Sequence, residues 1–174
     1  NLIGTIRGGS AFSAIGIYQP TTTNTGTTLI ANNMIRGVNS NGTGGDFASG
    51  IFVVAVVGTA NVFYNTVTMV GTLTGGAFPS YAFSAGSSAT ALNVQNNIFT
   101  STGSTGANLN RAMGFNFTNF TNLTSNYNDL VVSGTGAVVV AVADAFGDAA
   151  ALRVAAPRGA GVALPAGGVD RRVH

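Results

Sequence analysis

Short apolar runs alternate with glycine, asparagine and threonine along most of the chain, most clearly over residues 50–71. Runs of about four to eight residues that are rich in Val, Ile, Phe and Thr and end at Gly or Asn are typical of β-strands. A helix is disfavoured because β-branched residues lose side-chain freedom in it, and each glycine costs about 1 kcal/mol. The pattern therefore predicts an all-β fold.

Two markers recur within this pattern at nearly constant spacing. The first is a small residue between two usually larger ones, centred on Gly16, Gly50, Ala82 and Gly114. The second is an asparagine three residues after an apolar residue, found at Asn33, Asn65, Asn97 and Asn126. A fixed period of about 20 to 50 residues is the signature of stacked structural repeats. We therefore expect each segment to lie on its counterpart in the next repeat.

Stacking of like segments makes neighbouring strands parallel and about 4.8 Å apart. The continuous apolar run 51–54 suits a strand that is buried on both faces, as strands of parallel sheets are. The prediction is a single-stranded solenoid of about four coils over residues 1–135. The stretches 39–48, 71–80 and 101–110 are expected to be loops at one corner of this solenoid.

The recurring asparagines have a physical role in such a stack. Asparagine is the residue other than glycine that most readily adopts the left-handed conformation, which a tight corner between strands demands. Amides stacked about 4.8 Å apart can also hydrogen-bond from coil to coil. We therefore predict a structural ladder of Asn33, Asn65, Asn97 and Asn126. The alternative is that asparagine is simply abundant in this part of the chain.

Three segments resemble a known architecture; they read ANNMI from Ala31, ANVFYNTV from Ala60 and LNVQNNIF from Leu92. They look like repeats of the right-handed parallel β-helix, and residues 1–135 are similar to the pectin lyase-like superfamily. The resemblance implies a right-handed winding. It does not imply one activity, because this fold serves polysaccharide lyases, hydrolases, phage tailspikes and adhesins. The chain resembles most the noncatalytic segments of large secreted bacterial surface proteins, which implies an extracellular or cell-surface location.

Residues 136–174 differ from the repeats, because Asn, Thr and Ile give way to Ala, Val, Gly and Arg from Ala137 onward. One interpretation is a terminal cap, since alanine-rich residues 141–156 could form a helix over the open end of a solenoid. The other is that a GC-rich gene is read here in a shifted frame, which the nucleotide sequence of the gene would decide. Both interpretations predict a tail that is less ordered than the repeats.

The whole-chain composition limits the partners. Charged residues make up 7% of the chain, and lysine, glutamate and cysteine are absent. We therefore expect no basic surface for nucleic acid and no disulfide. The longest apolar runs are far shorter than the roughly 20 residues of a membrane span. The chain begins without a signal-peptide pattern, and we expect it to be a piece of a longer protein whose neighbouring parts are further repeats.

Side chains for catalysis are scarce within residues 1–135. Carbohydrate-cleaving β-helices resemble one another in gathering several acids on one face, whereas this region contains only Asp46 and Asp129. They lie more than two repeats apart, which corresponds to about 10 Å or more along the axis. The sole histidine is His174, near the end of the atypical segment. We therefore predict no catalytic, metal or cofactor site.

Several other side chains have two interpretations each. Three arginines could contact sugars or phosphates, or could simply be solvated loop charges: Arg7, Arg36 and Arg111. Three aromatic residues could stack against sugar rings, or could be buried under a loop: Phe47, Phe78 and Tyr81. Glycosylation sequons begin at Asn41, Asn116, Asn119 and Asn122, but such triplets arise freely in a chain rich in Asn and Thr. The alternation of Phe with polar residues over 116–124 predicts a strand.

The expected function is a noncatalytic structural or adhesive β-helix segment that contacts polysaccharide or cell-surface glycan. The alternative is a fragment of a polysaccharide lyase or glycoside hydrolase whose catalytic repeats lie elsewhere. Ice binding by rows of threonine is disfavoured, because the threonine-rich run 21–28 does not recur at the repeat spacing.

Overall fold

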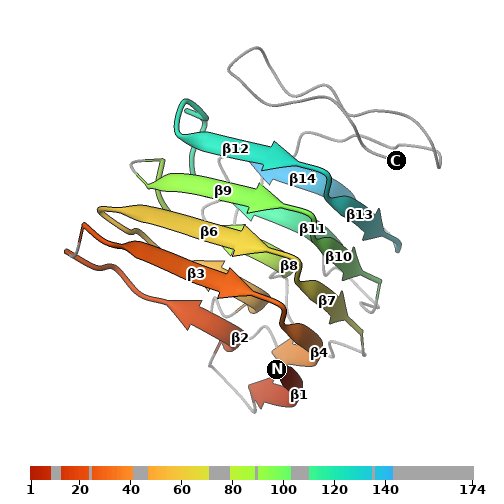
Figure 1. Cartoon of the computed structure of the whole chain (residues 1–174). Helices are drawn as coiled ribbons and strands as arrows, with labels where there is room; N and C mark the ends of the chain where they lie inside the picture. Colours follow the sequence, from red (N-terminus) through yellow and green to blue (C-terminus); the bar gives the residue numbers. More distant parts are fainter. Residues whose placement is uncertain are drawn as a thin grey trace.

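The computed structural model describes residues 1–8, 13–23, 25–40, 47–70, 79–88, 90–102, 110–134 and 136–142. Within these residues all regular secondary structure is β-strand, arranged in three sheets named here by their place in Figure 1. The front sheet consists of β3 (Thr27–Ala31), β6 (Thr59–Phe63), β9 (Ala91–Gln95) and β12 (Leu123–Asn126). The side sheet consists of β1 (Leu2–Gly8), β4 (Met34–Ser40), β7 (Thr66–Met69), β10 (Ile98–Ser101) and β13 (Asp129–Val132). The back sheet consists of β2 (Ala14–Gln19), β5 (Ala48–Val53), β8 (Ser80–Ala85), β11 (Asn110–Phe115) and β14 (Val138–Val142).

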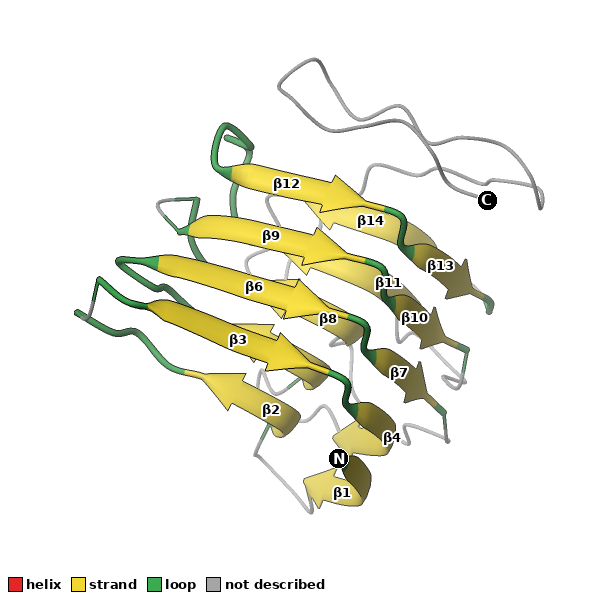
Figure 2. Ribbon diagram, viewed as in Figure 1, coloured by secondary structure: helices red, strands yellow, loops and turns green. Residues whose placement is uncertain are grey.

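The chain passes through the back, front and side sheets in turn and then returns to the back sheet one level higher (Figures 1 and 2). Every pair of neighbouring strands is parallel. In Figure 1 the near strands run to the right, the far strands return to the left, and successive coils rise, which is a right-handed winding. The predicted parallel β-helix is therefore confirmed. Its sheets hold five, five and four strands, so three to four turns separate the first and last strand of each, slightly fewer than the four expected.

The strand register follows the repeat spacing found in the sequence. In the front sheet Ile30 pairs with Val62 and Val62 with Val94, and in the side sheet Leu2 pairs with Met34. The three stretches predicted as loops each join a side strand to the next back strand. They share one corner of the coil, as the sequence predicts, although residues 41–46, 71–78 and 103–109 within them lie outside the described residues.

The three central strands of the back sheet are buried on both faces. All six residues of β5, β8 and β11 are buried. The prediction that the apolar run 51–54 is a strand buried on both faces is therefore confirmed as far as Val53, where β5 ends. Ile51 belongs to the inner core, whereas Phe52 points the other way and packs against Phe47 at 5.4 Å between ring centroids. A strand with apolar side chains on both faces carries no alternating pattern, which explains the continuous run in the sequence.

Phenylalanine rings fill the core toward its C-terminal end. Phe83 stacks on Phe99 at 5.6 Å, and Phe115 contacts Phe117 and Phe120 at 5.3 and 5.6 Å. The strand predicted over 116–124 is wrong for most of its length, because residues 116–122 form the connection between β11 and β12. The alternating rings pack together on Phe115 instead of lining one face of a strand.

The first sequence marker slips by two residues in its last repeat. Arg111 pairs with Tyr81 and Met113 with Phe83, which places Ala112 beside Ala82 where Gly114 was expected. The Cβ position of Gly50 faces Val67 and Met69 in the core, whereas that of Gly114 faces the Tyr81 ring. Gly114 is therefore not the structural counterpart of Gly50.

The strand β14 lies within the segment that the sequence separates as an atypical tail, residues 136–174. It pairs with β11, so the stacking of the back sheet continues to Val142. Residues 143–174, which include His174 and the predicted cap, lie outside the described residues.

The close packing of Gly50 generates the first prediction. A Cβ atom at this position would clash with Val67 Cγ1 of the side sheet and lie 2.7 Å from the carbonyl oxygen of Ala82. Gly50→Ala should therefore lower the free energy of unfolding by about 1–3 kcal/mol, the usual effect of overpacking a core. Urea denaturation followed by circular dichroism measures the change.

Gly4→Ala is the matched control, because the nearest atom to a Cβ there is Arg36 O at 3.9 Å. Its stability should stay within about 0.5 kcal/mol of the unchanged chain, as for most surface substitutions. Equal losses in the two variants would show that Gly50 is not a packing constraint.

Candidate functional site

The corner between the front and side sheets has the same two-residue form in four successive coils. Two residues lie between each front strand and the side strand that follows it, namely 32–33, 64–65, 96–97 and 127–128. The first residue of each pair is left-handed, with φ between 56° and 57° at Asn32, Tyr64, Asn96 and Tyr127. The second is a buried asparagine: Asn33, Asn65, Asn97 or Asn128.

The buried asparagines form a continuous hydrogen-bonded ladder along the solenoid. Asn33 Nδ2 donates to Asn65 Oδ1 at 2.9 Å, Asn65 Nδ2 to Asn97 Oδ1 at 3.0 Å, and Asn97 Nδ2 to Asn128 Oδ1 at 2.9 Å. Asn1 extends the row, because its Nδ2 donates to Asn33 Oδ1 at 3.0 Å. The ladder therefore links five successive levels of the described stack.

Each rung also satisfies buried backbone groups. The oxygen Asn97 Oδ1 accepts the backbone N–H of Asn65 at 2.9 Å as well as its amide. Asn97 Nδ2 donates back to the carbonyl of Val62 at 2.9 Å. A buried polar group without a partner costs about 1–3 kcal/mol, so the amides stabilise the corner only while neighbouring coils are in place.

The structure brings together Asn33, Asn65 and Asn97 as the sequence predicts, but Asn128 occupies the fourth rung, not Asn126. Asn126 ends β12 and pairs with Gln95, and its Oδ1 is buried without a hydrogen-bond partner among the described residues. The prediction failed because the apolar residue that precedes the other ladder asparagines by three positions is replaced here by Ser125. The Ser125 hydroxyl accepts a hydrogen bond from Asn128 Nδ2 at 3.1 Å.

A second correction concerns the left-handed conformation. The sequence assigned it to the ladder asparagines, whereas the structure assigns it to the residue before each of them. Asn32 and Asn96 fit that position well, but Tyr64 and Tyr127 do not. A side chain other than Gly, Asn or Asp costs about 1–2 kcal/mol in this conformation.

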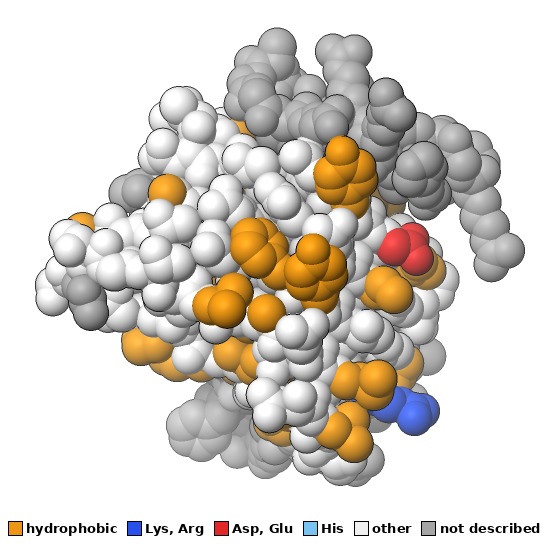
Figure 3. Space-filling view, viewed as in Figure 1, with side chains coloured by type: hydrophobic (Ala, Val, Ile, Leu, Met, Phe, Trp, Pro, Cys, Tyr) orange, Lys and Arg blue, Asp and Glu red, His pale blue; other side chains and the backbone are white. Residues whose placement is uncertain are grey.

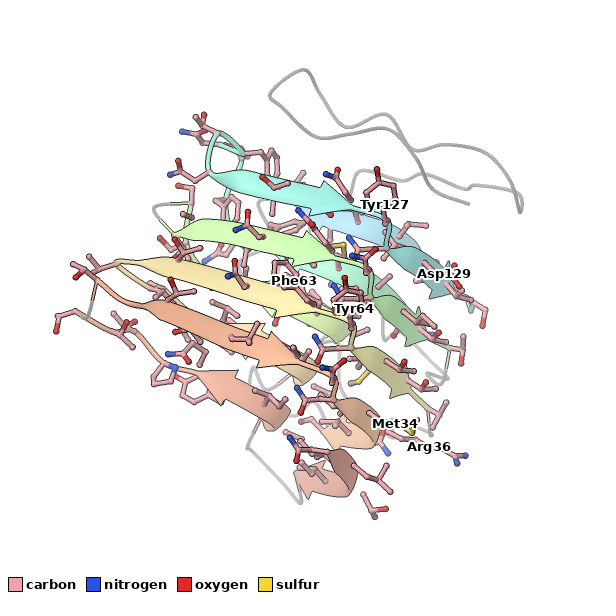
Figure 4. The ribbon with its side chains drawn as sticks, in the orientation of Figure 1. Met34, Arg36, Phe63, Tyr64, Tyr127 and Asp129 are labelled. Atoms are coloured by element: carbon pink, nitrogen blue, oxygen red, sulfur yellow. The ribbon has the colours of Figure 1, made fainter. Side chains whose placement is uncertain are left out.

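The four left-handed residues, Asn32, Tyr64, Asn96 and Tyr127, form an exposed row that we name the tyrosine corner. Tyr64 is 61% exposed and Tyr127 is 59% exposed. Both point away from the solenoid at the edge where the front sheet meets the side sheet (Figure 4). Phe63 precedes Tyr64, and its ring centroid lies 6.4 Å from that of Tyr64. Sequence reasoning missed this row, although Asn and Tyr alternate directly before the true ladder asparagines.

The surface on both sides of the tyrosine corner is almost uncharged. The strand register aligns Ala31, Phe63, Gln95 and Asn126 on the front sheet and Met34, Thr66, Ile98 and Asp129 on the side sheet. Figure 3 shows apolar side chains gathered on this face, with a basic and an acidic side chain only toward its right edge. The arrangement presents aromatic rings among amides and apolar groups.

The charged side chains that the structure describes are not gathered into one site. Arg36 on β4 and Asp129 on β13 are both exposed on the side sheet, three strand steps of about 4.8 Å apart (Figure 4). Arg111 is fully buried on β11, and its guanidinium carbon lies 5.4 Å from the ring centroid of Tyr81. The prediction of a solvated loop charge is wrong for Arg111, because the strand register directs it to the buried outer face of the back sheet. The Arg7 side chain and Asp46 lie outside the described residues.

Of the three aromatic residues singled out in the sequence, Tyr81 is internal and Phe47 is half-buried. Tyr81 is fully buried and meets Phe47 edge-on at 5.9 Å, so burial and not sugar stacking applies to it. Phe78 lies outside the described residues, as does the sequon asparagine Asn41. The sequon asparagines Asn116, Asn119 and Asn122 are exposed at the connection between β11 and β12.

Comparisons with protein-family models, curated proteins and solved structures found no match to this chain. The class of protein is therefore defined by its fold, a parallel β-solenoid with buried asparagine hydrogen bonds. The described strands and corners include no helix of the length and apolar character that a bilayer crossing needs. Nor do three or more His, Cys, Asp or Glu side chains cluster as metal ligands in that part of the chain.

The ladder assignment generates a prediction that separates two nearby asparagines. Asn128→Ala removes the acceptor of the Asn97 backbone N–H and amide, both buried, and should lower the free energy of unfolding by about 3 kcal/mol. Asn126→Ala is the matched control and should cause no such loss, because it removes a side-chain oxygen that has no hydrogen-bond partner among the described residues. Chemical denaturation of the two variants measures the difference, and a larger loss for Asn126→Ala would contradict the observed register.

The strained tyrosines generate a prediction in which a substitution raises the free energy of unfolding. Tyr64→Asn should raise the free energy of unfolding by about 1 kcal/mol, because asparagine adopts the left-handed conformation more readily. The reciprocal variant Asn96→Tyr should lower it by a similar amount. Thermal unfolding of both variants tests this, and stabilisation by Asn96→Tyr would show that the corner does not strain tyrosine.

Proposed function

We propose that this chain is a noncatalytic structural and adhesive β-helix segment of an extracellular bacterial protein, and that its outer surface contacts glycans. The observation that supports this most directly is the separation of roles at the corner. The buried asparagine amides bond coil to coil, while the adjacent tyrosines remain exposed on a nearly uncharged surface.

A stacked solenoid suits a structural role because it holds an extended surface in a fixed geometry. Neighbouring coils are joined by backbone hydrogen bonds through the corner itself, such as Ile98 N to Asn65 O at 2.8 Å and Asp129 N to Asn97 O at 2.8 Å. Side chains on the outer rows therefore keep a constant spacing of about 4.8 Å along the axis. Long polymeric ligands with their own repeat fit such a surface.

A polymer screen tests this proposal. The purified chain should be retained on one or more immobilised polysaccharides, including pectin, alginate, cellulose and chitin, without releasing new reducing ends or unsaturated sugars. Retention is measured by depletion of protein from solution, and turnover by reducing-sugar and ultraviolet assays.

The control is the double variant Asp46→Asn, Asp129→Asn, which removes both carboxylates of residues 1–135. Its retention should equal that of the unchanged chain. Turnover by the unchanged chain would contradict the noncatalytic proposal, and turnover lost in the double variant would support a carbohydrate-active fragment. Failure to bind any polymer would contradict the glycan-contacting role.

A further inference from the structure

We infer that the tyrosine corner is a binding site for an uncharged, extended β-1,4-linked polysaccharide that lies along the solenoid axis, with its sugar rings stacked on Tyr64 and Tyr127. This inference rests on the proposed glycan-contacting function and names the ligand class and the residues. Four observations support it: backbone strain, spacing, charge and rigidity.

Backbone strain distinguishes the two tyrosines from their neighbours in the row. Tyr64 and Tyr127 have φ of 56° in a position that Asn32 and Asn96 occupy without strain. The same corner therefore folds with asparagine, and the fold does not require tyrosine there. Residues that the surrounding structure holds in a strained backbone conformation are concentrated at binding and active sites. Their strong exposure is consistent with a role outside the core.

The spacing of the two rings matches an extended polymer. One corner, that of Asn96, separates Tyr64 from Tyr127, so the rings lie about 10 Å apart along the axis at about 4.8 Å per level. In an extended β-1,4-linked chain every second sugar presents the same face, and this two-sugar repeat is close to that distance. Two tyrosines in one row can therefore stack on equivalent faces of alternate sugars.

The surroundings favour a neutral ligand with many hydroxyl groups. Exposed amides of Asn32 and Asn96 alternate with the rings, and Gln95 lies beside them on the front sheet. Amides can both donate to and accept from sugar hydroxyls. The only charged residue in the two adjoining rows is Asp129, at the end of the side-sheet row. An acidic polymer would meet no basic side chain in these rows.

The asparagine ladder holds the tyrosine corner rigid. Tyr64 and Tyr127 each precede a buried asparagine, Asn65 or Asn128, whose amide is bonded to neighbouring coils. The backbone N–H of Tyr64 also donates to Gln95 O at 3.3 Å. A platform that is already ordered loses little conformational entropy on binding, which favours affinity.

Calorimetric titration of the full chain with cellohexaose and chitohexaose tests the inference, with polygalacturonate and alginate oligomers as charged probes. The chain contains no tryptophan and four tyrosines, so intrinsic tyrosine fluorescence gives a second, direct signal. We expect binding of at least one neutral hexaose, weaker binding of the matching disaccharide, and a change in tyrosine fluorescence. Tyr64→Asn and Tyr127→Asn should each weaken binding about tenfold, as for the loss of one stacked ring, and the double variant should abolish it.

Tyr18→Asn is the matched control, because Tyr18 is a 55% exposed tyrosine on the back sheet, away from this corner. It should bind the hexaose as tightly as the unchanged chain does. The variants at the corner place there the residue that adjacent coils already use, and their thermal unfolding verifies that they fold.

Three outcomes would overturn the inference: undiminished binding by the double variant, an equal loss in Tyr18→Asn, or a disaccharide that binds as tightly as the hexaose. Binding only to the charged oligomers would also overturn it but would leave the proposed glycan-contacting function standing. Binding to no oligomer or polymer would contradict both.

Discussion

Each coil of this protein depends on hydrogen bonds that only the next coil can complete. At the corner between the front and side sheets, Asn65 donates its backbone N–H and its amide to Asn97, and its carbonyl accepts the N–H of Ile98. An isolated coil would leave these groups buried without partners, or would have to expose the apolar side chains beneath them. Stability in such a stack therefore comes from contacts between neighbouring repeats more than from any single repeat.

The same constraint decides which parts of the fold could be predicted from sequence. The ladder permits only residues that can both donate and accept, so the step from Asn33 to Asn65 to Asn97 is visible in the sequence. The positions of the strands around the ladder follow from that constant step and from the runs of β-branched residues. Where the sequence departs from the pattern, as at Ser125, the register could not be found, because a hydroxyl replaces the apolar marker while the backbone pairing continues unchanged.

The candidate site was less predictable than the fold. The left-handed residue before each ladder asparagine is set by backbone geometry and does not require one side-chain type, so Tyr64 gave no local signal in the sequence. Arg111 was misassigned for a different reason. A lone arginine in a weakly charged chain suggests solvent exposure, but both faces of β11 are buried and Tyr81 covers the cation.

The hydrogen bonds between ladder asparagines all run the same way, which makes the two sides of each rung chemically unlike. The amides of Asn1, Asn33, Asn65 and Asn97 each donate to the next asparagine toward the C-terminal end. Each ladder oxygen therefore accepts from the preceding coil, and a coil that continues the ladder must have the same orientation as its neighbours. The ladder is therefore polar: it continues only through head-to-tail stacking, because head-to-head contact sets like groups against each other.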